Sequence, residues 1–196
     1  HIKSMPLNIA VIYGSVRDNR KGIRAARFIT KKCKERGFTT NLIDPLDYSL
    51  PLLKKMYKQF DEASAPEHMQ KLSDVFKEAD GYIIVSAEYN HSIPPALSNV
   101  LDHFLEEYFF KPSAILCYSA GSFGGVRAAM QLRAMLAEMG MSSIPSLLPV
   151  PNIGNAFEEN GSPNDEAYHR RAQRFLDEFQ WYTEALKSKR KEGTPY

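Results

Sequence analysis

The sequence is poor in cysteine and in long apolar runs, and each shortage excludes a class of protein. Only two cysteines, Cys33 and Cys117, occur in 196 residues. They are too few for a disulfide framework, and neither belongs to a Cys-x-x-Cys pair or a zinc-binding set. No stretch approaches the roughly 20 apolar residues of a membrane span, and the first residues lack the order of a secretory signal. We therefore expect a cytoplasmic protein without a membrane partner.

The net charge is also small: 25 Lys and Arg residues against 23 Asp and Glu residues give a formal charge of +2. This balance does not favour a nucleic-acid partner. The short basic run 187–191 is typical of a solvated helix end, where cations suit the helix dipole. We interpret residues 1–4 as the remnant of an expression tag and expect the natural sequence to start near Met5. The length and the 43% hydrophobic content predict a single domain over residues 1–196.

Apolar runs and helical patterns alternate along the chain. Runs typical of buried parallel strands occupy 7–13, 40–43, 81–86, 114–119 and 143–148. Helical spacing of apolar residues marks 26–33, 69–79, 97–104, 129–139 and 172–186. In the last of these, Phe175, Phe179 and Tyr182 are expected in the core rather than at a cofactor site. The alternation predicts an α/β fold, a parallel sheet with helices on both faces.

Two connections, 45–66 and 150–165, are longer than the rest, and long loops in compact domains are often functional. The first contains the apolar and basic segment 50–57. Two interpretations stay open: this segment lines a pocket or a subunit contact, or it closes over the core.

The segment after the first strand, 14–22, has the features of a phosphate site. Gly14 permits a tight turn, Ser15 offers a hydroxyl, and Arg17 and Arg20 add charge beside the free N–H groups of the next helix. An ordinary polar turn is the alternative, but cations at a helix start without an anion oppose the dipole. The segment matches neither Gly-x-x-x-x-Gly-Lys-Ser/Thr nor Gly-x-Gly-x-x-Gly, so a monophosphate fits best.

The segments after the third and fourth strands reach the same edge of such a sheet, where ligands bind. In 87–95, Tyr89 is placed to contact a flat ring and the backbone of 88–90 to read its polar rim, while Ser92 is expected to cap the helix that the two prolines begin. In 119–127, the glycines allow the backbone to approach a ligand closely.

Together these three segments resemble the NADPH-dependent FMN reductase family over roughly residues 7–145. The matching motifs are Gly-Ser-x-Arg, Glu-Tyr-Asn-x-Ser-x-Pro and Ser-Ala-Gly-x-x-Gly-Gly-x-Arg, in family order. The resemblance implies a flavodoxin-like, five-stranded parallel sheet of order 2-1-3-4-5 and a homodimer. It also implies an FMN site, whose phosphate would be held by Ser15, Arg17, Arg20 and Gly22. The isoalloxazine would be bordered by Ala87, Glu88, Tyr89 and Asn90 and, on its other side, by Ser119, Ala120 and Gly121.

By the same resemblance the chain is an oxidoreductase. Hydride would pass from NADPH or NADH to FMN and then to a small-molecule acceptor (flavin, quinone, azo compound or metal ion) in a ping-pong cycle. The cofactor would carry the chemistry, without an essential acid–base side chain. A flavodoxin-type electron carrier and a redox-sensing interaction protein remain alternatives. Many family members have serine near Arg20, so this chain is expected to bind phosphate more electrostatically.

Several tempting residues are interpreted as structural. His103, Glu106 and Glu107 have spacing compatible with a metal, but we expect ordinary surface charges. His91 is expected to be a packing neighbour in its loop. Cys33 and Cys117 lie in apolar segments and are expected to be buried and inert.

Overall fold

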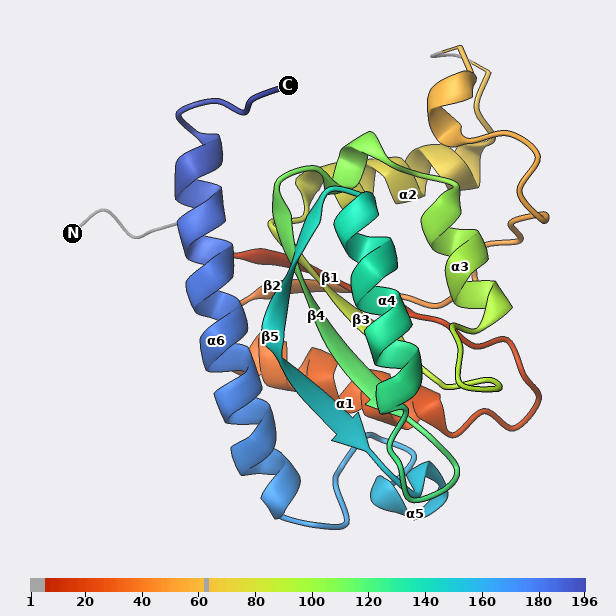
Figure 1. Cartoon of the computed structure of the whole chain (residues 1–196), viewed down its shortest axis with the longest axis vertical. Coiled ribbons are helices and arrows are strands. Elements are labelled where there is room, and N and C mark those ends of the chain that lie inside the picture. The colour runs from red at the N-terminus through yellow and green to blue at the C-terminus, as the bar shows by residue number, and fades with distance from the viewer. Residues whose placement is uncertain (1–5, 62–63) are drawn as a thin grey trace.

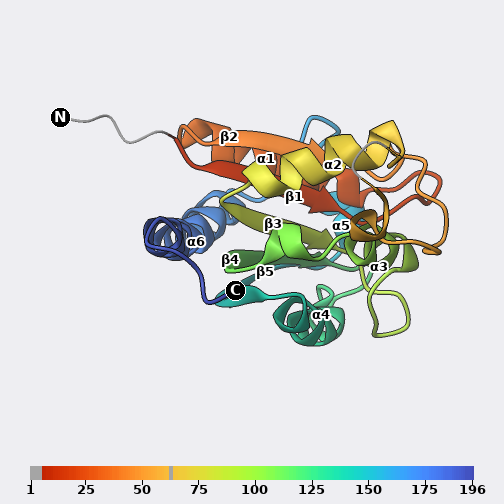
Figure 2. The same ribbon diagram turned by 90° about the horizontal axis from the view of Figure 1, so that it is seen from above.

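The computed structural model describes residues 6–61 and 64–196, which form a sheet of five parallel strands. The strands are β1 (Asn8–Tyr13), β2 (Thr39–Ile43), β3 (Gly81–Ser86), β4 (Lys111–Tyr118) and β5 (Met141–Val150). Their order is β2-β1-β3-β4-β5, and Figure 2 shows them stepping from β2 at one edge to β5 at the other. This is the flavodoxin-like order, so the predicted fold class is confirmed.

Helices alternate with the strands, as the periodicity predicts. The long ones are α1 (Gly22–Glu35), α2 (Glu67–Glu78), α3 (Pro95–Asp102), α4 (Val126–Glu138) and α6 (Ala167–Arg190). The short ones are α5 (Ile153–Ala156) and the 3-10 turns η1 (Tyr57–Gln59) and η2 (Glu106–Tyr108). Within the described residues, no helix is long and apolar enough to cross a membrane.

The sheet is covered on both faces, which explains why every residue of β3 and β4 is buried. Phe28 of α1 and the predicted core residues Phe175 and Phe179 of α6 pack in one apolar cluster. Phe76 of α2 and Leu101 of α3 pack with α4 in the other. Figure 1 shows α6 and α4 on opposite sides of the sheet. Each core thus uses one face of the alternating strand residues.

β4 begins three residues before the predicted start. The prediction missed these residues because the first of them is a lysine, which is buried. Lys111 Nζ donates to the carbonyls of Phe76 (2.8 Å) and Lys77 (2.9 Å) at the end of α2. Burial lowers the pKa of Lys111 to about 8. A charged residue that caps a distant helix interrupts the apolar run, so periodicity alone places the strand too late.

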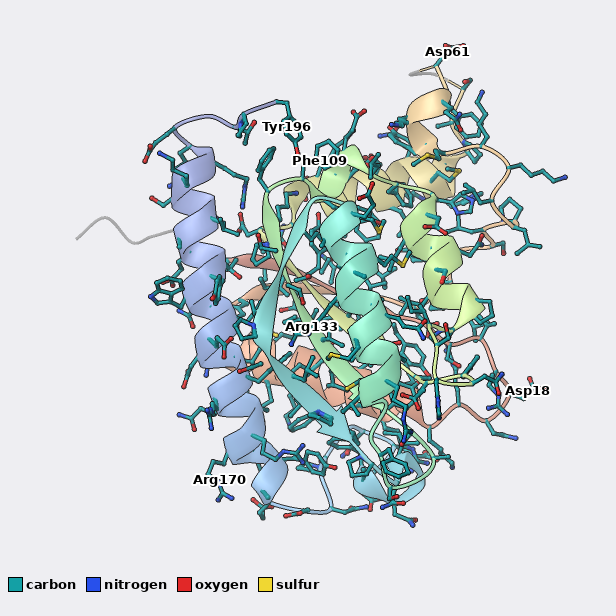
Figure 3. All side chains as sticks on the ribbon, in the orientation of Figure 1. Asp18, Asp61, Phe109, Arg133, Arg170 and Tyr196 are labelled. Carbon is teal, nitrogen blue, oxygen red and sulfur yellow. The ribbon has the colours of Figure 1, made fainter. Side chains whose placement is uncertain are left out.

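At the same end of the molecule, the basic end of α6 and the residues His103 and Glu107 differ from what the sequence predicts. Lys187 Nζ lies 2.7 Å from Asp80 and Arg190 lies 3.5 Å from it, so the basic helix end is anchored rather than simply solvated. His103 and Glu107, expected at the surface, are buried. Glu107 accepts a hydrogen bond from Ser73 (2.8 Å). Figure 3 shows Tyr196 beside Phe109 at this end; their ring centroids are 5.6 Å apart.

The segment 50–57 lies against α3 and closes over the core, whereas its interpretation as a subunit contact stays a prediction. Asn99 holds it through the N–H of Leu53 (3.0 Å) and the carbonyl of Pro51 (2.9 Å). Leu50 packs on the core, whereas Leu52 is 79% exposed. The segment therefore closes over the core with one side and leaves apolar side chains in solvent with the other.

Candidate functional site

A hollow of about 250 Å³ lies at the carboxyl ends of β1, β3 and β4. Three loops line it: 15–22, 87–89 and 118–120, with Ile153 of α5. All of the predicted site residues line this hollow except Asn90 and Gly121, which lie in the same loops just beyond it. The common edge of the parallel strands thus brings together segments that are about 100 positions apart in the sequence.

The start of α1 offers unpaired backbone donors to an anion. Its N-cap residue is Lys21, and among the described residues no side chain caps this helix; its first turn also has no acid. Ser15 is buried, and its Oγ accepts a hydrogen bond from the N–H of Arg17 (3.3 Å) and lies 3.2 Å from the hydroxyl of Tyr89. Free N–H groups, a positive dipole end and a hydroxyl suit a phosphate.

Arg20 has a protein partner in this loop. Its guanidinium makes two bonds to Asp44, at 2.6 and 2.5 Å, and a third to the carbonyl of Ser15 at 2.7 Å. The hydrogen bond with Asp44 raises the pKa of Arg20. Its charge is therefore already balanced, and Arg20 orders the loop, while Arg17 and Lys21 are exposed cations. The expectation that Arg20 makes binding electrostatic applies better to these two.

Tyr118 is a lining residue that sequence reasoning missed. A Cβ at Gly22 would lie 2.1 Å from Cζ of Tyr118, so only glycine lets α1 start against this ring. The Tyr118 hydroxyl is 3.3 Å from that of Tyr13. Burial raises the pKa of Tyr118, which keeps its hydroxyl protonated. The one available signal was its place at the end of β4, directly before the predicted Ser119.

The loop after β3 is a tight turn. The N–H of Tyr89 donates to the carbonyl of Ser92 (3.1 Å) and the N–H of Ser92 to that of Tyr89 (2.9 Å). Asn90 and His91 both have positive φ, at 52° and 61°. The prediction that Ser92 caps α3 is wrong: Pro94 is the N-cap residue, and the Ser92 hydroxyl donates to Gln131 instead. Arg17 lies over the Tyr89 ring, 5.7 Å from its centroid.

Glu88 fixes this loop to the next one. Its Oε2 accepts hydrogen bonds from the backbone N–H groups of Arg127 and Ala128, both at 3.0 Å, at the start of α4. The helix, whose first turn has no acid of its own, is thus capped from another loop. This side chain therefore has a structural task in addition to its place at the edge of the hollow.

The loop after β4 closes on itself through Ser119. Its hydroxyl donates to the carbonyl of Gly121 (2.8 Å) and accepts from the N–H of Gly124 (2.8 Å). The N–H of Asn152 also donates to the Gly121 carbonyl (2.9 Å). Gly125 has φ of 80°, and a Cβ there would meet the Tyr118 carbonyl at 2.7 Å. Gly125 thus serves the approach of protein backbone to protein backbone, whereas a Cβ at Gly121 would meet open space.

Known proteins resemble this chain in sequence and in fold. Residues 7–155 match the model of the NADPH-dependent FMN reductase family. A quinone reductase of Pseudomonas putida is 29% identical, covering 90% of this chain and 94% of its own. The NAD(P)H-dependent FMN reductase ntnL of a Nectria species is 33% identical over 73% of this chain and 74% of its own. The flavoenzyme FerB of Paracoccus denitrificans has the same fold, with a TM-score of 0.74, 24% identity and coverage of 91% and 97%.

The chain belongs to the NADPH-dependent FMN reductase family. The predicted family, the enzyme class of NAD(P)H-dependent oxidoreductase and FMN as cofactor are confirmed at this level. The residues present fit FMN: the donors of α1 suit its phosphate, and the hollow between the loops after β3 and β4 suits its ring. In the described residues, no cluster of three or more His, Cys, Asp or Glu side chains is arranged for a metal ion.

Proposed function

We propose that this protein passes hydride equivalents from NADPH or NADH through FMN to a small acceptor, such as a quinone or free flavin, in a ping-pong cycle. The observation that carries the proposal is the uncapped, acid-free start of α1 beside a hollow bordered by two loops. The relatives named quinone reductase and FMN reductase support these acceptors.

Each loop has a distinct task in this proposal. Ser15, Arg17 and Gly22 contact the phosphate through hydroxyl, charge and backbone N–H, and Arg20 keeps that loop in shape through Asp44. The backbone of 87–90, with the Tyr89 ring, borders one side of the flavin ring, and 119–121 borders the other. Bound FMN supplies the hydride chemistry.

In this proposal the side chains around the hollow bind and orient the cofactor. The carboxylate of Glu88, which lines the hollow, is held by two N–H groups of α4. Tyr118 keeps its proton because burial raises its pKa. Backbone N–H groups beside the ring would stabilise the negative charge that it gains, as preorganised dipoles do elsewhere.

Binding and turnover test this function separately. The protein is incubated with FMN, desalted and mixed with NADPH without oxygen; a retained flavin spectrum that bleaches rapidly is the expected result. Riboflavin, which lacks the phosphate, should bind far more weakly than FMN. Parallel double-reciprocal plots with a quinone acceptor should establish the ping-pong order. Retained flavin without bleaching would favour an electron carrier or a sensor, and equal affinity for riboflavin would refute the phosphate site.

We also propose a cytoplasmic homodimer. Leu52 (79% exposed) and Leu53 (42% exposed) present apolar surface on the loop held by Asn99. Light scattering should give twice the chain mass of 22.2 kDa. Leu52→Asp should shift the protein towards the monomer, whereas Trp181→Asp, on α6, should not.

A further inference from the structure

The turn beside the proposed flavin ring is strained. Its two central residues, Asn90 and His91, both adopt positive φ. A turn of this kind favours Asn-Gly, because glycine reaches this region without steric cost, whereas histidine does not. Strained backbone persists only when its surroundings hold it in place.

Gln131 of α4 supplies that restraint with both ends of its side-chain amide. Its Nε2 donates to the carbonyl of His91 (2.7 Å), and its Oε1 accepts from the hydroxyl of Ser92 (2.7 Å). The His91 carbonyl accepts only, so the orientation of the amide is determined. Gln131 lies on the exposed side of α4, and its amide reaches across to the turn.

The turn connects this restraint to the rest of the site. Its two internal hydrogen bonds use the N–H groups of Tyr89 and Ser92. Among the hydrogen bonds of the described residues, none uses the N–H of Asn90 or His91. The neighbouring Tyr89 hydroxyl is 3.2 Å from Ser15 Oγ in the phosphate loop. A relaxed turn would therefore disturb both the ring side and the phosphate side.

We propose that Gln131 is a positioning residue that holds the 89–92 turn in its left-handed form and thereby sets the affinity and the midpoint potential of bound FMN. The proposal rests on the proposed function. Without the amide, His91 should relax to negative φ and its peptide groups should reorient. Donors that stabilise negative charge on the ring would then be lost, so the potential should fall.

The experiment compares Gln131→Leu with Gln173→Leu, the same change on the exposed face of α6 far from the turn. We expect Gln131→Leu to weaken FMN binding about tenfold, the effect of one or two lost hydrogen bonds, and to lower the midpoint potential. The double variant Gln131→Leu with His91→Gly creates Asn-Gly, which adopts the turn unaided. This double variant should recover most of the FMN affinity and of the midpoint potential of the unaltered protein. If Gln131→Leu acted only by removing a contact, His91→Gly would not restore either quantity.

Amide hydrogen exchange of the Ser92 N–H in the FMN-free protein provides a readout that does not involve flavin. Exchange should accelerate in Gln131→Leu and slow again in the double variant. Unchanged exchange, or affinity and potential equal to those of Gln173→Leu, would overturn the restraint. Lack of rescue by His91→Gly would overturn the role of strain. Failure of the unaltered protein to bind FMN, with exchange responding as expected, would instead refute the proposed function and the flavin part of this inference.

Discussion

Gly22→Ala tests the contact between α1 and Tyr118 on which the proposed phosphate site depends. The new Cβ would lie 2.1 Å from Cζ of Tyr118, whereas carbon atoms prefer about 3.5–4.0 Å. The ring or the helix must therefore shift by more than about 1 Å. Overpacking of this kind costs about 1–3 kcal/mol, and the better helix propensity of alanine offsets up to about 1 kcal/mol of it.

The direction of the shift determines the functional effect. Tyr118 is buried and packs against Tyr13, with ring centroids 6.5 Å apart, but it also lines the hollow. The hollow offers space to the displaced ring, so the ring should invade the proposed FMN site. We expect a net loss of about 1 kcal/mol in the free energy of unfolding and at least a tenfold loss of FMN affinity, equivalent to about 1.4 kcal/mol.

Urea unfolding of the FMN-free protein and a fluorescence titration with FMN measure the two effects. Gly154→Ala in α5 is the matched control, because no heavy atom of the described residues, apart from its chain neighbours and its own helix backbone, lies within 4 Å of the new Cβ. That variant should keep its stability and its FMN affinity. If Gly22→Ala behaved like Gly154→Ala in both assays, the contact between Gly22 and Tyr118 would not shape the site.

Three further predictions concern a carboxylate that caps a helix, a buried lysine and two buried thiols. Glu88→Gln removes the charge that caps α4 and should lower the unfolding free energy by about 1–2 kcal/mol in urea; an unchanged value would refute the cap. Lys111 has a lowered pKa of about 8, so its burial costs most when it is charged, and stability should rise from about pH 8 to 10 relative to Lys111→Met. Coincident pH profiles would contradict this sign. Burial raises the pKa of Cys33 and Cys117 to about 12, so iodoacetamide should label both only after unfolding; rapid native labelling would show that they are accessible.

Much of the architecture followed from local patterns. Apolar runs of strand length alternating with helical spacing allow few arrangements besides a parallel sheet with helices on both faces, because crossovers between parallel strands have one hand. The carboxyl ends of such strands share one edge, so the segments 14–22, 87–95 and 119–127 were bound to meet there. Glycines and polar residues directly after strands are local signals, and they predicted the segments that line the hollow.

The local pattern did not reveal which distant residues the loop side chains contact. Arg20 pairs with Asp44, Glu88 caps a helix that starts at Val126, and Gln131 holds a turn some 40 residues away. Each contact joins segments whose separation depends on sheet order and helix packing, and no periodicity encodes that distance. The sequence by itself determined the class of fold and which loops meet; the tertiary structure decided which side chains are free to hold a ligand and which hold the loops.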